Sequence, residues 1–310
     1  MRQLTYTIDE SFEGKKISAL LVSKGFSSEI IKMLKRGGLY VNGSAAPTVF
    51  VLSKNDTVKI IFPDEENTAQ PILASGVKIV YADEDLVIAD KPPFLPMHQS
   101  IAHYEDTLAN HFAAIYPKCR FRCVTRLDKN TSGLCVIALN KPAAAILCHR
   151  RPQKLYYAVV EGITEKTGTV NAPIAREEES MIKRKVCAQG QPAITHYKTL
   201  KTNADDNVSL LEISLETGRT HQIRVHMSYI GHPLCGDELY AGRTDIINRQ
   251  ALHCGYVKFF HPLTGKEMEF KSQIPEDMKK LLYAKQTSVG TTGTYTEDHE
   301  KLPFNSDNKV

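Results

Sequence analysis

Long apolar runs are missing from this sequence. No stretch approaches the roughly 20 consecutive apolar residues that span a bilayer, which predicts that no segment crosses a membrane. The first residues, 1–10, contain no apolar core, so we expect no signal peptide. The seven cysteines are an odd number and include no C-x-x-C pair. Buried, reduced thiols of this kind indicate a cytoplasmic protein.

Motifs for cofactors are also missing. The sequence has no G-x-x-x-x-G-K-[ST] phosphate loop and no G-x-G-x-x-G after a strand, so no nucleotide cofactor is expected. The histidines His221, His226 and His232 are the candidate metal ligands. No clustered cysteine or carboxylate completes a tetrahedral set around them, which argues against zinc. We therefore predict no cofactor and no metal.

Positive charge is concentrated at one end of the chain. The formal net charge is +4, and residues 1–62 carry nine Lys and Arg against five Asp and Glu, which is the whole excess. A basic segment beside a near-neutral body suggests docking to a polyanion. The alternative is a solvated helical face, and charge alone does not separate the two.

Residues 1–62 also have their own pattern of elements. Apolar residues at helical spacing predict a helix over 17–21 and a second one over 28–36, with Lys32, Lys35 and Arg36 on its polar side. Strands are then expected at 39–41 and 58–62, and Asn42-Gly43 between them is typical of a tight turn.

This order of elements resembles the small RNA-binding module named after ribosomal protein S-four. The string K-R-G-G-L-Y-V-N-G at residues 35–43 carries the resemblance. The opening differs, because Lys15-Lys16-Ile17 stands where the module often has R-L-D. The resemblance implies that Lys32, Lys35 and Arg36 contact RNA.

The remainder of the chain divides by composition. Residues 63–76 are polar, acidic and proline-containing, which indicates a linker. Residues 77–285 alternate predicted strands with short helices, which favours a second domain of the α+β class. Residues 286–310 are nearly free of large aliphatic side chains, so we expect a disordered tail.

Three strings in the second domain carry the candidate chemistry. In R-L-D-K-N-T-S-G at 126–133, a carboxylate precedes a turn and a buried strand; a turn-capping Asp is the alternative. In K-L-Y-Y-A-V-V-E-G at 154–162, Tyr156 lies on one face of a predicted strand, where an ordinary core Tyr is the alternative. The third string, T-G-R-T-H-Q-I-R-V-H, covers 217–226.

Read together, the strings closely resemble the signatures of the RluA/RluD family of pseudouridine synthases, which isomerise uridine within RNA. Two departures are local. Thr125 stands where the family commonly has His, and Pro93-Phe94 lacks the usual Gly of the K-P-x-G segment. The resemblance implies an α+β pseudouridine-synthase fold with a central, mostly antiparallel sheet.

The resemblance also implies the site residues. Asp128 is the expected nucleophile, Arg224 its ionic partner, and Tyr156 the ring that stacks on the uracil. A guanidinium suits this place because it stays charged and holds a carboxylate in a fixed geometry. The residues expected to touch substrate RNA in this domain are Arg126, Leu127, Thr131, Arg219, His221 and Gln222.

The predicted function is isomerisation of specific uridines in structured RNA, with ribosomal RNA ahead of transfer RNA, by a monomer in the cytoplasm. A synthase directed at transfer RNA and a catalytically inactive RNA-binding protein remain as alternatives. So does a hydrolytic N-glycosidase that uses the same acid and releases uracil. That last reading is disfavoured because glycoside hydrolases usually need two carboxylates, and the three strings offer no second one.

Overall fold

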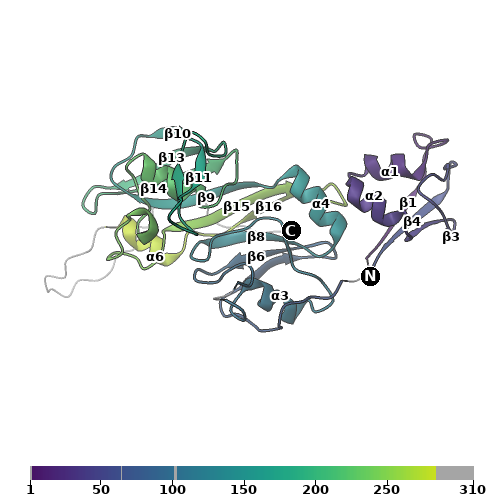
Figure 1. Cartoon of the computed structure of the whole chain (residues 1–310), viewed down its shortest axis with the longest axis horizontal. Helices are drawn as coiled ribbons and strands as arrows, with labels where there is room; N and C mark the ends of the chain where they lie inside the picture. The colour runs from purple at the N-terminus through teal and green to yellow at the C-terminus, as the bar shows by residue number, and fades with distance from the viewer. Residues whose placement is uncertain (1, 64, 101–102, 284–310) are drawn as a thin grey trace, which may run out of the picture.

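The N-terminal residues build a small sheet with two helices on it. The computed structural model describes residues 2–63, 65–100 and 103–283. The small sheet has the order β1-β4-β2-β3 and lies at one end of the elongated molecule (Figure 1). Its elements are β1 (Arg2–Thr7), α1 (Ile17–Ser23), α2 (Ser28–Leu34), β2 (Leu39–Val41), β3 (Ser44–Ala45) and β4 (Thr57–Phe62).

The predicted helices and strands of this region are present. The Ser27 side chain caps α2 by accepting a hydrogen bond from the backbone amide of Ile30, and the apolar faces of both helices join one core. Strand β1 was missed by the sequence analysis. Of its residues only Leu4 is buried, so few apolar side chains mark the strand, and its pairing with β4 specifies it.

A ten-stranded sheet forms the body of the molecule, in the order β10-β13-β14-β9-β15-β8-β6-β5, with β7 and β16 paired at its side. All its pairings are antiparallel except that of β15 with β8. The predicted α+β class with a mostly antiparallel sheet is therefore confirmed. Its strands are β5 (Lys78–Ala82), β6 (Leu86–Lys91), β7 (Arg122–Cys123), β8 (Ser132–Ala138), β9 (Gln153–Glu161), β10 (Thr167–Asn171), β13 (Ile194–Asn203), β14 (Val208–Leu215), β15 (Leu252–Phe260) and β16 (Glu267–Lys271).

Short helices and one extra hairpin surround this sheet (Figure 1). They are α3 (Leu108–Ile115), the hairpin of β11 (Ile174–Arg176) and β12 (Arg184–Val186), α4 (Lys141–Arg150), α5 (Gln222–Tyr229), η1 (Glu238–Tyr240), α6 (Glu276–Lys279) and η2 (Lys280–Leu282). Helix α4 lies between the large sheet and the N-terminal module, where Ala145 packs against the core of the module. The disordered tail predicted for 286–310 lies outside the described residues.

The described part of segment 63–76 is held along the body of the molecule. Apart from a single β-bridge at Glu65 it forms no helix or strand, as expected of a connector. However, Asn110 on α3 donates its side-chain amide to the carbonyl of Gln70 at 2.9 Å, and the amide of Ala74 donates to His111 Nδ1 at 3.0 Å. The backbone of this connector therefore supplies the groups that bond to α3.

Phe94 has a left-handed backbone, with φ +64°. This is the position where the family usually has Gly, and a bulky residue there is strained. The residue is 46% exposed, so burial of its ring offsets only part of that strain. We expect Phe94→Gly to raise the free energy of unfolding by up to about 1 kcal/mol in urea titrations. Phe94→Ala, which removes the ring but keeps a Cβ, is the control; equal stability of the two variants would contradict the strain.

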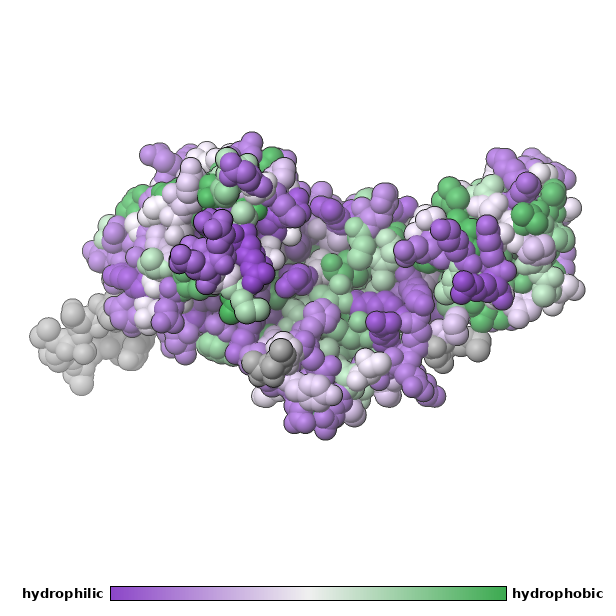
Figure 2. All heavy atoms as spheres, in the orientation of Figure 1, coloured by the Kyte–Doolittle hydropathy of each residue, from purple (hydrophilic) through white to green (hydrophobic). Residues whose placement is uncertain are grey.

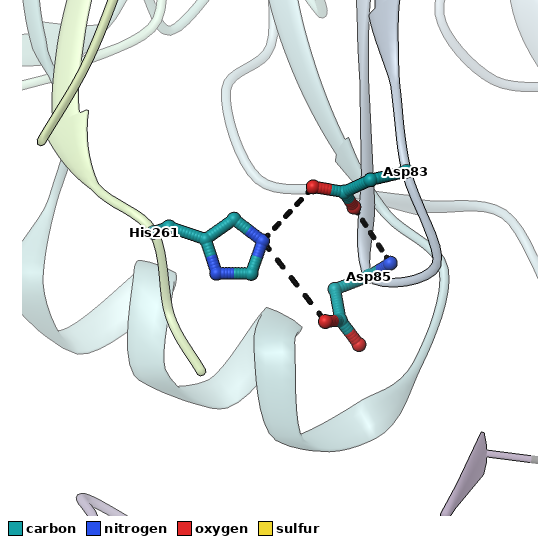
Figure 3. Close-up of side chains that lie close together, drawn as sticks. All are labelled: Asp83, Asp85 and His261. Atoms are coloured by element: carbon teal, nitrogen blue, oxygen red, sulfur yellow. Dashed lines mark hydrogen bonds and ion pairs between the residues drawn. The ribbon is translucent and has the colours of Figure 1, made fainter. Parts of the chain in front are cut away.

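An ionic cluster joins the N-terminal module to the large sheet, and Figure 3 shows the three members of it that lie outside that module. Arg2 on β1 donates from Nε and Nη2 to the two carboxylate oxygens of Asp85, at 2.6 and 2.9 Å. Asp85 is 3% exposed and also accepts from the side-chain amide of Asn140 at 2.8 Å. Behind it, His261 Nε2 lies 3.0 Å from Asp83 Oδ2 and 4.0 Å from Asp85 Oδ2.

The spacing of Asp83, Asp85 and His261 would also suit a metal ion, but these groups are already engaged. The amides of Leu263 and Thr264 donate to His261 Nδ1, which leaves its proton on Nε2, facing Asp83. A cation would have to displace both that proton and the Arg2 guanidinium. The cluster is therefore best described as a salt-bridged joint between the two parts.

Loss of Arg2 should loosen this joint. Arg2→Met removes the charged partner of the buried Asp85 and leaves its carboxylate with one neutral donor. Leaving a buried polar group short of a partner costs about 1–3 kcal/mol. We expect a larger radius of gyration in small-angle X-ray scattering and faster proteolysis near residues 63–76. Lys54→Met, which removes an exposed ion pair with Glu10, should change neither measurement. An unchanged scattering profile for Arg2→Met would show that the joint does not hold the module.

Candidate active site

The loop that carries Asp128 is fixed at both ends. It connects β7 to β8, and the amide of Thr131 donates to the carbonyl of Asp128 at 3.1 Å to close a turn. On one side of Asp128, Leu127 is 5% exposed and belongs to the main core. The Asp128 side chain itself is 22% exposed. A buried neighbour thus anchors a carboxylate that solvent can reach.

Gly133 explains why the string ends in T-S-G. Strand β8 runs parallel to β15 here and places Gly133 opposite Cys254. A Cβ on Gly133 would lie 2.3 Å from the carbonyl oxygen of Cys254, and its φ is +113°. Only glycine fits this close approach of two backbones. The contact fixes where β8 begins and hence where the preceding loop stands.

Arg224 on α5 lies between two carboxylates. Its Nη1 donates to Asp128 Oδ2 at 3.3 Å, so residues 96 positions apart in the sequence meet. Its Nε and Nη2 donate to Asp237 at 2.6 and 2.8 Å, in a bidentate pair. The Asp237 side chain is only 1% exposed and that of Arg224 8%. Asp237 therefore orients the guanidinium, and the remaining nitrogen faces Asp128.

The charge of Arg224 is secure in this setting. Burial alone would lower its pKa, but the hydrogen bonds and charges of Asp237 and Asp128 outweigh burial and raise the pKa above the usual arginine value. Its guanidinium also stacks over the ring of Tyr240, with Cζ 5.0 Å from the ring centroid. A permanently charged group thus lies beside the candidate nucleophile.

His221 is a second neighbour of Asp128, with Nε2 3.8 Å from Asp128 Oδ2. Its Nδ1 lies 2.9 Å from the hydroxyl of Tyr240, which itself accepts from the amide of Arg184 at 2.9 Å. This arrangement favours Tyr240 donating to Nδ1, which leaves the imidazole proton on Nε2, toward Asp128. Burial lowers the pKa of His221 and favours the neutral ring, although the negative charge of Asp128 opposes that shift.

Tyr156 lies on β9 and is 5% exposed. Its hydroxyl accepts a hydrogen bond from Lys154 Nζ at 2.8 Å. Burial raises the pKa of Tyr156, the Lys154 charge opposes that rise, and the negative charge of Asp128 adds to it. The phenol is therefore neutral.

Residues 85–229 match the family of RNA pseudouridylate synthases. The uncharacterized RNA pseudouridine synthase YjbO of Bacillus subtilis is 40% identical over 271 residues, which cover 83% of this chain and 95% of the relative. This chain belongs to the RNA pseudouridine synthases. Ribosomal large subunit pseudouridine synthase D of Haemophilus influenzae is 35% identical, covering 80% of this chain and 81% of the relative. The predicted RluA/RluD-type family and isomerase class are thus confirmed.

A solved structure agrees in fold. Human RNA pseudouridylate synthase domain containing 1 superposes with a TM-score of 0.55 and 30% sequence identity, over 66% of this chain and 86% of that one. The part of this synthase that the structure describes contains no helix long and apolar enough to cross a membrane.

The other residues predicted to contact RNA differ in their exposure and in their protein partners. Arg126 is exposed beside it, and Thr131 is buried and accepts from the Gln250 side chain at 3.3 Å. Arg219 Nε turns away to the carbonyl of Pro192 at 3.1 Å. The Gln222 amide is occupied by four protein partners and braces the start of α5. Their contact with RNA stays a prediction.

The sequence analysis missed three residues of this site: Asp237, Tyr240 and Lys154. Asp237 ends the string G-H-P-L-C-G-D at 231–237, outside the three strings that carry the candidate chemistry. Tyr240 follows on η1, and Lys154 begins the string that gave Tyr156. Arg224 offered a signal for Asp237, because a buried guanidinium needs further hydrogen-bond partners besides Asp128.

Proposed function

We propose that this synthase isomerises uridine to pseudouridine in ribosomal RNA, with Asp128 as the nucleophile. The observation that carries the proposal is the contact of Asp128 with Arg224, which Asp237 holds in place. The ribosomal target is supported by relatives named for the ribosomal large subunit. The N-terminal basic module supports a structured RNA as the substrate.

The reaction is balanced without a cofactor. The bond between ribose C1′ and uracil N1 breaks, the uracil turns, and a new bond joins C1′ to C5. The proton on C5 leaves and N1 gains one, so substrate and product have the same mass. Asp128 adds to the ribose or to the base in this scheme and is released at the end.

Arg224 supports that role by electrostatics. The carboxylate is the nucleophilic form of this side chain, and the charged guanidinium holds it in place through a charge-assisted hydrogen bond. The Asp128 carboxylate makes a single bond to Arg224, whereas Asp237 makes two. One Asp128 oxygen therefore stays available to the substrate while the guanidinium remains anchored.

The target base has to leave its stack to reach Asp128, at a cost of about a few kcal/mol. Stacking on Tyr156 returns about 1–3 kcal/mol of that cost. Arg126 is exposed two residues before the acid, where it can occupy the space that the extruded base leaves. These are proposed roles for the two side chains.

Docking is assigned to the N-terminal module in this proposal. Lys32, Lys35 and Arg36 are all exposed, and none makes an ion pair with the part of the chain that the structure describes. Unpaired cations on one surface suit RNA phosphates and would make binding sensitive to salt. We propose residues 1–62 as this docking module, 77–285 as the catalytic domain, and a cytoplasmic monomer as the working form.

Deletion in the host tests the function. Pseudouridines would be mapped in ribosomal and transfer RNA with and without the gene, and with an Asp128→Ala copy restored. We expect specific ribosomal sites to disappear and to return only with the unaltered copy. Loss of sites in transfer RNA alone would favour the other substrate class, and an unchanged map would favour an inactive RNA-binding protein.

A further inference from the structure

Lys91 is a fully buried lysine beside the catalytic loop. It is the last residue of β6 and is 0% exposed. The chain turns away after it into residues 92–98, and on the neighbouring strand Lys91 is paired with Gly133, at the end of the Asp128 loop. Buried lysines are rare because desolvating an ammonium is costly, so its surroundings have to compensate.

Three backbone carbonyls provide that compensation. Nζ donates to Pro92 O at 2.8 Å, to Leu95 O at 2.9 Å and to Lys129 O at 3.0 Å. An ammonium has three protons, and all three are used. Two of these carbonyls belong to the turn after β6, and the third belongs to the residue that follows Asp128. One side chain thus ties two loops together at the catalytic carboxylate.

We propose that Lys91 is a positioning residue for Asp128, and that its ammonium holds the catalytic loop through the Lys129 carbonyl. The inference rests on the proposed role of Asp128 as nucleophile. Lys91 touches no reacting atom in this account. Its effect is to fix the backbone from which the carboxylate projects.

The groups around Lys91 set the pH range in which its side chain is protonated. Burial is the largest influence and lowers the pKa of Lys91 to about 8. The titratable groups that face it are Cys135, Asp128 and Asp90, whose ionised forms raise the pKa, and the Arg249 guanidinium, which lowers it. Arg249 is itself paired with Asp277 on α6 and reaches the carbonyl of Asn130 in the same loop, at 3.5 Å.

Loss of the proton has a structural consequence. A neutral amine has two protons for three carbonyls, and its lone pair would face the third oxygen. At least one tie is then lost, and the buried carbonyl left unpaired costs free energy. We therefore expect the catalytic loop to loosen as Lys91 deprotonates, while the sheet around it stays folded.

The test follows tritium release from RNA labelled at uridine C5 under single-turnover conditions, between about pH 7 and pH 9.5. The wild-type rate should fall above the pKa of about 8 and be about 30-fold lower at pH 9.5, because each pH unit above a pKa reduces the protonated fraction tenfold. Lys91→Arg keeps a permanent charge and should lack this alkaline decrease. Any decrease caused by the RNA itself remains in both proteins.

Stability provides a second readout with the opposite sign. The pKa of Lys91 is lower in the folded state than the 10.5 of an exposed lysine, so the unfolded chain binds more protons between these values. Its contribution to stability therefore rises with pH across that window. Relative to Lys91→Met, the wild-type melting temperature should increase from about pH 8 to pH 10 while its activity falls.

Each result has a definite reading. A flat wild-type profile, or an alkaline decrease of the same size in Lys91→Arg, would overturn the inference. If neither variant folds, the rate and the circular dichroism of the wild type across the pH range decide. A rate that falls while circular dichroism stays native supports the inference, and a fall that tracks unfolding overturns it. Absence of tritium release at every pH would instead contradict the proposed function.

Discussion

Asp128→Asn should abolish uridine isomerisation, with a single-turnover rate about 10⁴-fold or more below that of the wild type. The amide keeps the shape of the carboxylate but has no charge and cannot add to the nucleoside. Tritium release from C5-labelled RNA measures the loss directly, because the C5 proton leaves when the new bond forms. RNA affinity should change by less than tenfold, since the docking cations are elsewhere.

The control is Asp205→Asn, which changes an exposed acid in the turn between β13 and β14. It should keep the wild-type rate within about twofold, because surface substitutions away from such a site have little effect. Thermal unfolding of both variants shows whether the fold is intact. A folded Asp128→Asn protein with more than about one hundredth of the wild-type rate would remove Asp128 from the role of nucleophile.

Arg224→Met should lower the free energy of unfolding by about 3–5 kcal/mol, the usual cost of removing one partner from a buried ion pair. Asp237 is 1% exposed and would lose both of its charge-assisted bonds. The variant should also isomerise uridine at least about 100-fold more slowly, because Asp128 loses its ionic partner. Urea titration and tritium release measure the two effects separately.

A double variant separates the effect on stability from the effect on activity. Arg224→Met with Asp237→Leu removes both charges and should recover most of the lost stability, since a buried pair replaced by apolar side chains is often neutral. Its activity should stay low, because Asp128 still lacks its ionic partner. Arg224→Lys should not restore activity, since an ammonium cannot bond Asp237 twice and reach Asp128. Full activity in the double variant would show that Arg224 acts only on stability.

The two-residue contact at the centre of the site was predictable from the sequence, although Asp128 and Arg224 are far apart in it. Both lie in strings rare enough to be matched as wholes, and these strings include the residues that fix their backbones. Gly133 is one such residue, since it permits the approach of β8 to β15. The helices of the N-terminal module were predictable for another reason, which is that their apolar residues recur at helical spacing.

Other features depend on distant partners and leave little local signal. Lys91 ends an apolar strand, and nothing in its neighbours shows that three carbonyls will surround its ammonium. Arg2 lies in a mostly polar segment, and its role depends on Asp85 more than 80 positions away. Phe94 shows the reverse case: its left-handed backbone explains the usual Gly, which the sequence analysis had noted only as missing.

The most direct test of this account is nucleoside analysis of a uridine-containing ribosomal RNA fragment after incubation with the purified wild type and with Asp128→Asn. We predict pseudouridine in RNA of unchanged mass with the wild type, no free uracil, and unmodified uridine with the variant. Free uracil and an abasic RNA would identify a hydrolase. Equal amounts of pseudouridine with both proteins would show that a group other than this carboxylate performs the reaction.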